Sequence, residues 1–219
     1  MLVYYITDRS QFAGDERART VALLAKIAEA ARWGVDLIQL REKDLPANQL
    51  ESLTWAAVQV VRGQTPQAAV SRRRTRILIN SRVDVAIACA ADGVHLRSHD
   101  ISARDVSKVW RSSALGGKGS QPLIGVSCHS PAEVAKARLE GADFAVFAPV
   151  FEKKGMSEAV PSGLEALRQA CKENIPVLAL GGVTLENVSS CLEAGAAGIA
   201  AIRLFQQEDM ERVVSSLRD

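Results

Sequence analysis

The chain has 219 residues, of which 47% are hydrophobic and 24% are charged, and 27 basic against 25 acidic side chains give a net charge of +2. This apolar fraction excludes general disorder, because disordered chains are poor in hydrophobic residues and rich in one sign of charge. The nearly balanced charge argues against nucleic acid as the main partner, since binding to a phosphate backbone needs an extended basic surface.

The first residues, MLVYYITDRS, lack a basic segment followed by a long apolar stretch, so no signal peptide is expected. No run reaches the roughly 18–20 apolar residues that cross a bilayer, so we expect no membrane partner. The cysteines are scattered and form no Cys-x-x-Cys pair, which is typical of free thiols in a reducing compartment; they are Cys89, Cys128, Cys171 and Cys191. We therefore expect a cytoplasmic protein, and homo-oligomer formation is left open.

Short apolar segments alternate with longer amphipathic segments along the whole chain. An amphipathic helix is expected over residues 16–33, where apolar residues recur every three or four positions until Gly34, and a last helix over residues 207–217. Eight strand–helix units in one chain of this length predict a single domain, residues 1–219, folded as a parallel (β/α)8 TIM barrel. The predicted strands are 2–7, 35–40, 76–80, 93–96, 123–127, 144–148, 176–180 and 198–202.

Three connections are long or unusual in composition. Residues 62–75 are polar and basic and predict a solvated loop, and residues 114–121 contain Gly-Gly-Lys-Gly-Ser and predict a flexible connection. Residues 151–162 follow the sixth predicted strand and are numerous enough to form a lid. Loops that follow strands lie on the face where barrel enzymes hold their chemistry.

Polar side chains follow the second predicted strand. Gln39, Arg41 and Lys43 would share one face if the strand alternation continued through them, and together they would form an anion clamp at the barrel mouth. The alternative is a surface turn with scattered charges. Asn80 ends the third strand and is expected to bond a heterocycle or a phosphate.

The fourth and fifth strands bring two histidines to the same end of the barrel. His95 is equally compatible with a hydrogen-bonded core position and with ligand contact. Ser127 and His129 are expected on the inward face, whereas Cys128 between them points the other way. His129 is the best candidate for proton transfer, because an imidazole titrates near neutral pH. A histidine with only a capping or loop role remains the alternative.

The last two strands predict a phosphate site. Gly181 and Gly182 follow the seventh strand, and Ile202 and Arg203 end the eighth. In TIM barrels these two loops commonly bind phosphate through backbone N–H groups and a helix N-terminus, and glycines permit the close approach. A plain tight turn at the glycine pair is the alternative.

The chain resembles the thiamine phosphate synthase/TenI family in segments that run in register from the first predicted strand to the eighth. These segments are 39–44, 80–84, 92–96 with Asp100, 124–130, 141–144, 148–151 and 179–183. The resemblance implies a TIM barrel that binds thiazole phosphate. Synthases of this family join hydroxymethylpyrimidine diphosphate to thiazole phosphate with Mg²⁺ and release pyrophosphate. TenI-type members are tautomerases that move a proton on a thiazole carboxylate phosphate.

The resemblance also implies roles for individual residues. In the synthases, the positions of Gln39, Arg41 and Lys43 hold the pyrimidine diphosphate, and carboxylates at the positions of residue 81 and Asp100 bind Mg²⁺. His129 matches the catalytic histidine of TenI, although synthases have a histidine there as well.

Three departures from the synthase pattern stand out. Ser81 replaces an aspartate, and a hydroxyl is a weak ligand for Mg²⁺. The stretch after the sixth strand lacks the synthase threonines, and either Lys153 or Lys154 is expected to replace the synthase lysine. Arg203 replaces a small serine beside the thiazole phosphate, where it either strengthens phosphate binding or fills part of the pocket.

The lost carboxylate affects metal-assisted departure of pyrophosphate more than it affects phosphate binding. We therefore expect a TenI-like thiazole tautomerase with His129 and Ser127 as catalytic residues and no required cofactor. The alternative is a thiamine phosphate synthase that uses Mg²⁺ at Asp100. Further alternatives are a catalytically silent ligand-binding or regulatory barrel, another phosphate-binding isomerase, and an aldolase that forms a Schiff base on Lys43. For the tautomerase, the expected ligand is a small phosphorylated heterocycle, thiazole phosphate.

Overall fold

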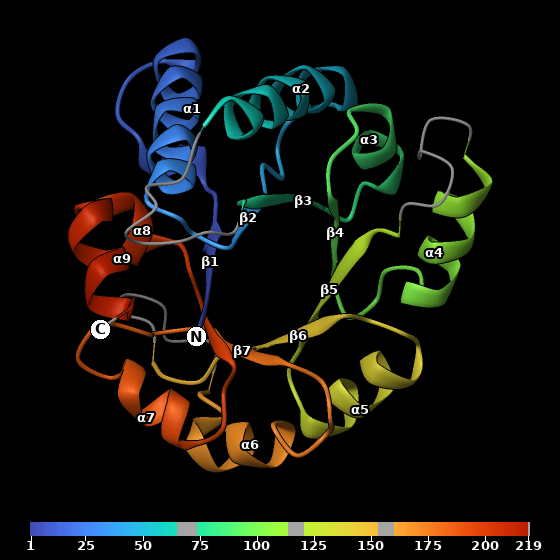
Figure 1. Ribbon diagram of the computed structural model, residues 1–219, viewed down its shortest axis with the longest axis vertical. Coiled ribbons are helices and arrows are strands. Elements are labelled where there is room, and N and C mark those ends of the chain that lie inside the picture. The colour runs from blue at the N-terminus through green and yellow to red at the C-terminus, as the bar shows by residue number, and fades with distance from the viewer. Residues whose placement is uncertain (65–73, 114–120, 153–159, 219) are drawn as a thin grey trace.

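The computed structural model describes residues 1–64, 74–113, 121–152 and 160–218 (Figure 1). Within these residues, parallel strands close into a barrel in the order β1 to β8, with β1 paired to β8. The predicted TIM barrel is confirmed. The strands are β1 (Leu2–Ile6), β2 (Leu37–Leu40), β3 (Arg76–Asn80), β4 (Gly93–Leu96), β5 (Leu123–Cys128), β6 (Phe144–Phe147), β7 (Val177–Ala179) and β8 (Gly198–Ala201).

Helices form the outer ring around the barrel (Figure 1). Several begin where the sequence supplies a capping side chain: Asp15 accepts a hydrogen bond from the Ala18 N–H at 2.8 Å, and Ser130 caps the helix that Pro131 opens. The described helices are η1 (Arg9–Gln11), α1 (Glu16–Arg32), α2 (Ala47–Gly63), α3 (Val83–Ala88), α4 (Ala103–Ser112), α5 (Pro131–Leu139), α6 (Gly163–Ala170), α7 (Val188–Glu193), α8 (Arg203–Gln207) and α9 (Met210–Arg218).

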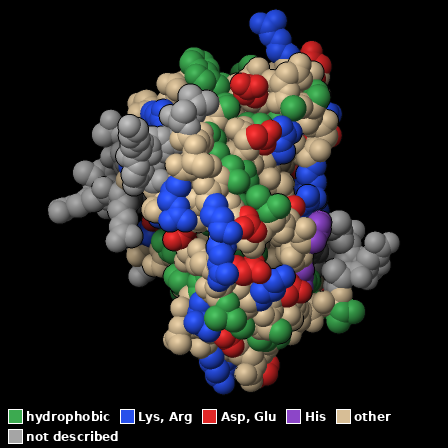
Figure 2. Space-filling view, turned by 90° about the vertical axis from the view of Figure 1, so that its right-hand side faces the viewer, with side chains coloured by type: hydrophobic (Ala, Val, Ile, Leu, Met, Phe, Trp, Pro, Cys, Tyr) green, Lys and Arg blue, Asp and Glu red, His purple; other side chains and the backbone are tan. Residues whose placement is uncertain are grey.

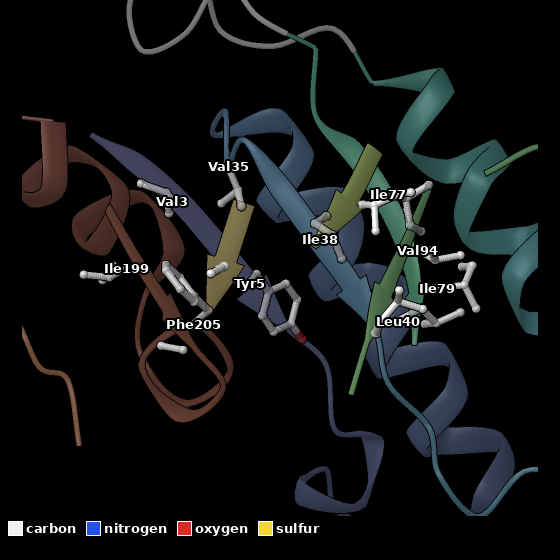
Figure 3. Close-up of a cluster of buried hydrophobic side chains, with 14 of the residues drawn as sticks. Val3, Tyr5, Val35, Ile38, Leu40, Ile77, Ile79, Val94, Ile199 and Phe205 are labelled. Carbon is white, nitrogen blue, oxygen red and sulfur yellow. The ribbon is translucent and has the colours of Figure 1, made fainter. Parts of the chain in front are cut away.

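Strand alternation divides the buried side chains into two layers. Val3, Tyr5 and Ile38 point outward and join the layer between the barrel and its helices (Figure 3). Tyr4 and Phe144 point inward and pack edge to face with ring centroids 5.5 Å apart. A Cβ at Gly125 would overlap the Phe144 ring, so the glycine leaves space for this ring inside the barrel. The inside of the barrel is therefore filled by packed side chains.

The surface carries both signs of charge. On the side of the barrel that carries α4, Lys and Arg side chains alternate with Asp and Glu rather than forming a single basic field (Figure 2). None of the helices in the described ranges is long and apolar enough to cross a membrane.

The structure corrects several predicted boundaries. Five of the strands are one or two residues shorter than predicted, β5 is one residue longer, and β3 and β4 match their predictions. The expected helix over 207–217 is wrong in its start, because α8 ends at Gln207 and α9 begins at Met210. Asp209 supplies a side-chain acceptor for the Arg212 N–H at 2.8 Å, which favours a new helix start. α2 continues to Gly63, so the predicted loop over 62–75 is wrong in its start, and residues 65–73 of that loop lie outside the described residues.

Candidate active site

The mouth of the barrel places Gln39 and Asn80 in direct contact. Gln39 is the second-last residue of β2 and is 2% exposed, and its Nε2 donates to Asn80 Oδ1 at 2.9 Å. Asn80 ends β3, and its Nδ2 in turn donates to Ser81 Oγ at 3.3 Å. Adjacent parallel strands with matched register bring these amides together, and the bond orients both of them across the mouth.

Arg41 lies just beyond β2 and is half-buried. Among described residues, its guanidinium has no hydrogen-bond or ion-pair partner, and only its backbone N–H is bonded, to Thr7 Oγ1 at 3.0 Å. Burial lowers the pKa of Arg41, while the negative charges of Asp8 and Glu42 act in the opposite direction. An arginine stays a cation at neutral pH despite such a shift. The side chain therefore presents a partly desolvated positive charge at the mouth.

The expected clamp of alternating side chains holds only in part. β2 ends at Leu40, so the strand alternation does not continue through residues 41–43. Lys43 is exposed, and Glu42, which lies between Arg41 and Lys43, is buried. The difference arises because residues 41–45 form a turn that folds back on η1.

Glu42 is held by a buried ion-pair network that sequence reasoning did not reveal. Thr7 Oγ1 donates to Glu42 Oε1 at 2.6 Å, and Arg9 Nη1 donates to Oε2 at 3.2 Å. Arg9 is 4% exposed and also pairs with Asp44 through both terminal nitrogens. The network fixes the backbone on either side of Arg41 and so positions its guanidinium.

His95 lies inside the barrel, 2% exposed, between Tyr4 and Ser127. Its Nδ1 is 3.2 Å from the Tyr4 hydroxyl, and its Nε2 is 2.8 Å from Ser127 Oγ. The pKa of His95 is lowered from 6.5 to about 3, mainly by burial and also by the charge of Arg41, while the charge of Asp100 acts in the opposite direction. His95 is a neutral, hydrogen-bonded core histidine that anchors the Ser127 hydroxyl at the mouth.

His129 follows β5 and is exposed, unlike His95. Its Nδ1 is 2.8 Å from the carbonyl oxygen of Ala148, and its backbone N–H donates to Glu133 Oε2 at 2.8 Å. A carbonyl oxygen only accepts, so Nδ1 carries the proton and Nε2 of the neutral ring is the acceptor. The sequence predicts both Ser127 and His129 on the inward face; the Ser127 hydroxyl bonds His95, whereas His129 lies beyond the end of β5 and bonds the Ala148 carbonyl.

Ser81 and Asp100, which occupy the positions of the family's two metal-binding carboxylates, are in contact. The contact here is a hydrogen bond between a hydroxyl and a carboxylate. Ser81 Oγ donates to Asp100 Oδ2 at 2.6 Å. Arg97 reaches the same carboxylate with Nη2 at 2.9 Å and Nε at 3.1 Å from Oδ1, and with its backbone N–H at 2.8 Å from Oδ2. Burial alone would raise the pKa of Asp100, but the hydrogen bonds from Arg97 and Ser81 lower it. Arg97 was not recognised from the sequence as a site residue.

These residues do not fit a magnesium ion. The described part of the chain contains no group of three or more His, Cys, Asp or Glu side chains that could hold a metal. Asp100 is the one carboxylate at the expected position, and both its oxygens already accept hydrogen bonds. Mg²⁺ is usually held by one or two carboxylates together with substrate phosphates and water, and the one carboxylate here is already paired with the guanidinium of Arg97. We therefore assign no chemical step to a metal at this place.

The glycine pair after β7 adopts a conformation that other residues avoid. Gly181 has φ +98° and Gly182 has φ +66°, and a Cβ on Gly181 would lie 2.8 Å from Pro149 Cα. The Gly181 carbonyl accepts from the Phe151 N–H at 2.9 Å, while neither glycine N–H donates to a described residue. The turn therefore leaves backbone donors at the mouth. Ile202 and Arg203 lie at the start of α8, beside the end of β8.

Some predicted features lie outside the described residues. They are Lys153, Lys154, most of the expected lid over 151–162 and most of the connection over 114–121. Cys128 is buried and points toward the helices, and burial raises its pKa to about 12. A thiol held in this state is a poor nucleophile, as its place in the strand alternation predicts.

The chain is similar to known proteins along nearly its whole length. A relative in Geobacter sulfurreducens is 40% identical over 202 residues, which are 91% of this chain and 84% of its own length. The thiamine-phosphate synthase of Methanoculleus marisnigri is 36% identical over 220 residues, 99% of this chain and 93% of that protein.

A solved structure agrees with these relatives. The thiamine phosphate pyrophosphorylase of Pyrococcus furiosus superposes with a TM-score of 0.76 at 28% identity, covering 99% of this chain and 93% of that one. A 3-hexulose-6-phosphate synthase superposes with a TM-score of 0.65 at 16% identity, which shows a shared fold. The family model for thiamine monophosphate synthase matches residues 3–205. The chain belongs to the thiamine monophosphate synthase family.

Proposed function

We propose that this protein is a thiamine-phosphate synthase, which joins hydroxymethylpyrimidine diphosphate to thiazole phosphate and releases pyrophosphate. The observation that carries the proposal is the half-buried guanidinium of Arg41, which has no acceptor among described residues. A partly desolvated cation needs an anion to offset its lost hydration, and a guanidinium matches a phosphate with two parallel hydrogen bonds. Support also comes from the relative named thiamine-phosphate synthase that aligns over 99% of the chain.

The other mouth residues then have distinct tasks. The Gln39–Asn80 pair offers amide groups fixed in orientation to a heterocycle, and the Ser127 hydroxyl on β5 is held in place by His95. The N–H groups of Gly181 and Gly182, which donate to no described residue, suit the phosphate of the thiazole partner. Two phosphorylated substrates would thus be oriented across one barrel mouth, and positioning of this kind lowers the barrier to a bimolecular step.

A second candidate is the TenI-type tautomerase favoured by the sequence alone, in which a phosphate anchor and one proton shuttle suffice. His129 supports it, since Nδ1 on the Ala148 carbonyl fixes the tautomer that leaves Nε2 as a proton acceptor. Ser81 supports it as well, because a proton transfer has no need for the second metal carboxylate. The relatives' names favour the synthase over this candidate.

The two candidates are separated by product analysis. The purified protein is incubated with hydroxymethylpyrimidine diphosphate and thiazole phosphate, with either Mg²⁺ or EDTA, and thiamine phosphate is quantified by chromatography. A parallel sample contains the thiazole carboxylate phosphate tautomer, and its aromatisation is followed by NMR. Thiamine phosphate above the protein-free control supports the synthase. Aromatisation without thiamine phosphate would replace the synthase by the tautomerase.

A further inference from the structure

Arg97, Asp100 and Ser81 form a cluster at the mouth in which hydrogen bonds and an ion pair join the three side chains. Asp100 has a side chain only 12% exposed, whereas the Arg97 side chain is 51% exposed. Four donor groups converge on the two carboxylate oxygens: Ser81 Oγ, and the N–H, Nε and Nη2 of Arg97. One negative and one positive charge leave the unit neutral, so an incoming divalent cation would have to displace a guanidinium that is already paired.

The hydroxyl of Ser81 is held in place by its own backbone. Ser81 has φ +61°, which is uncommon for a residue with a side chain, and its N–H donates to the His95 carbonyl at 2.9 Å. A residue held in this region persists because its surroundings determine it. The fixed hydroxyl and Arg97 together orient Asp100 as an acceptor of hydrogen bonds rather than as a free metal ligand.

Arg97 keeps donors beyond those that Asp100 uses. A guanidinium has five N–H groups, and the contacts to Asp100 use Nε and Nη2. Nη1 makes no hydrogen bond with a described residue. A cleft of about 450 Å³ opens between residues 96–103 and α5, and Arg97, Asp100 and Ser127 are among its lining residues. Glu133, Lys136 and Glu140 of the α5 side also line the cleft, which gives solutes access to the Arg97 guanidinium.

We propose that Arg97, anchored by Asp100 and Ser81, is the cation of an anion subsite, so that this barrel binds the diphosphate group of its substrate without a divalent metal. The proposal rests on the proposed function, because the diphosphate belongs to the pyrimidine substrate. The ligand class is a diphosphate monoester, and inorganic pyrophosphate presents the same charged oxygens. Arg41 and Arg97 would then contact the diphosphate from two sides of the mouth.

Calorimetry with inorganic pyrophosphate tests the subsite without any turnover. Wild-type protein is titrated in EDTA and in Mg²⁺, and the expected dissociation constants agree within about threefold. Arg97→Gln should weaken binding in EDTA about tenfold or more, the usual scale for a charged hydrogen bond. Arg111→Gln is the matched control, since Arg111 is exposed on α4 and bonds only the Ser107 carbonyl of its own helix among described residues. Circular dichroism verifies that each variant is folded.

A second measurement asks whether the metal site can be restored. The double substitution Ser81→Asp with Arg97→Gly should create Mn²⁺ binding detectable by electron paramagnetic resonance, which wild-type protein should lack. The proposal is overturned if wild-type protein binds pyrophosphate only with Mg²⁺ or not at all, if Arg97→Gln binds as wild type does, or if wild-type protein binds Mn²⁺ at this position. Thiamine phosphate formation that depends on Mg²⁺ would overturn the subsite and leave the synthase standing. If the protein binds pyrophosphate without metal but forms no thiamine phosphate, the subsite stands and the synthase is overturned.

Discussion

The Nε2 atom of His95 on β4 lies 2.8 Å from the hydroxyl of Ser127 on β5, in the last layer of side chains below the barrel mouth. The register between the two strands sets Gly125 opposite His95, so the imidazole reaches past the glycine to the next inward residue. A neutral histidine thus fixes a polar group that faces the substrate side.

This relationship predicts how stability depends on pH. The pKa of His95 is about 3 in the folded protein and near 6.5 when unfolded. Between these values the unfolded chain binds a proton that the folded protein does not, so stability falls as the pH drops from about 6.5 toward 3 and is unaffected above that window. The slope from this one group reaches at most about 1.4 kcal/mol per pH unit. Urea unfolding at pH 7 and pH 5 measures it.

His95→Gln is the control for that experiment, because it keeps hydrogen-bonding capacity and removes the titration. The variant is less stable at pH 7, and its stability should change less between pH 7 and pH 5 than that of wild-type protein. An identical change in both proteins would show that His95 is not the group responsible.

Arg41→Met should weaken binding of hydroxymethylpyrimidine diphosphate by about 10- to 100-fold, since hydrogen bonds to a charged group contribute roughly 1.5–3 kcal/mol. The substitution keeps the apolar stem and removes the guanidinium. Calorimetry measures the dissociation constant. Arg212→Met, on the exposed face of α9, is the matched control and should bind as wild type does. Equal affinity in the two variants would remove Arg41 from the anion site.

Gly182→Ala should lower stability by about 1–3 kcal/mol and weaken thiazole phosphate binding. Its φ of +66° is unfavourable for alanine, and the new Cβ would overlap the Glu152 carbonyl oxygen and the Phe151 side chain. Gly63→Ala at the end of α2 is the contrasting variant, since a Cβ there meets nothing within 4 Å and should be neutral or slightly stabilising. Thermal unfolding compares the pair, and equal melting temperatures would refute the strained turn.

His129→Asn tests the proton-transfer role. If the protein carries out tautomerisation, this variant should lose about 10²-fold in its rate, the usual scale for a general acid–base. Thiazole phosphate binding should stay within a few-fold, because the histidine side chain contacts the Ala148 carbonyl and lies outside the glycine turn. Proton exchange followed by NMR gives the rate. Unchanged turnover would exclude His129 from the chemistry.

The sequence predicts the barrel because alternation of short apolar runs and amphipathic helices is a local signal. The same alternation places Gln39 and Asn80 on the inside, and the structure joins them. It does not predict the contact between His95 and Ser127, since that depends on register between strands. The alternation also does not predict that Glu42 is buried. Glu42 lies in a turn after β2, where strand alternation no longer applies, and its burial depends on the ion pair with Arg9, which is distant in the sequence. Arg97 escapes it because its contacts are made by a loop.

The most direct measurement of the central claim is a ³¹P NMR time course of one sample that contains the protein, hydroxymethylpyrimidine diphosphate and thiazole phosphate. Formation of the new bond must release pyrophosphate, so a pyrophosphate signal should grow in step with a thiamine phosphate signal. Arg41→Met should slow both signals equally. Spectra in which neither product exceeds the protein-free control would contradict the assignment of this barrel as a thiamine-phosphate synthase.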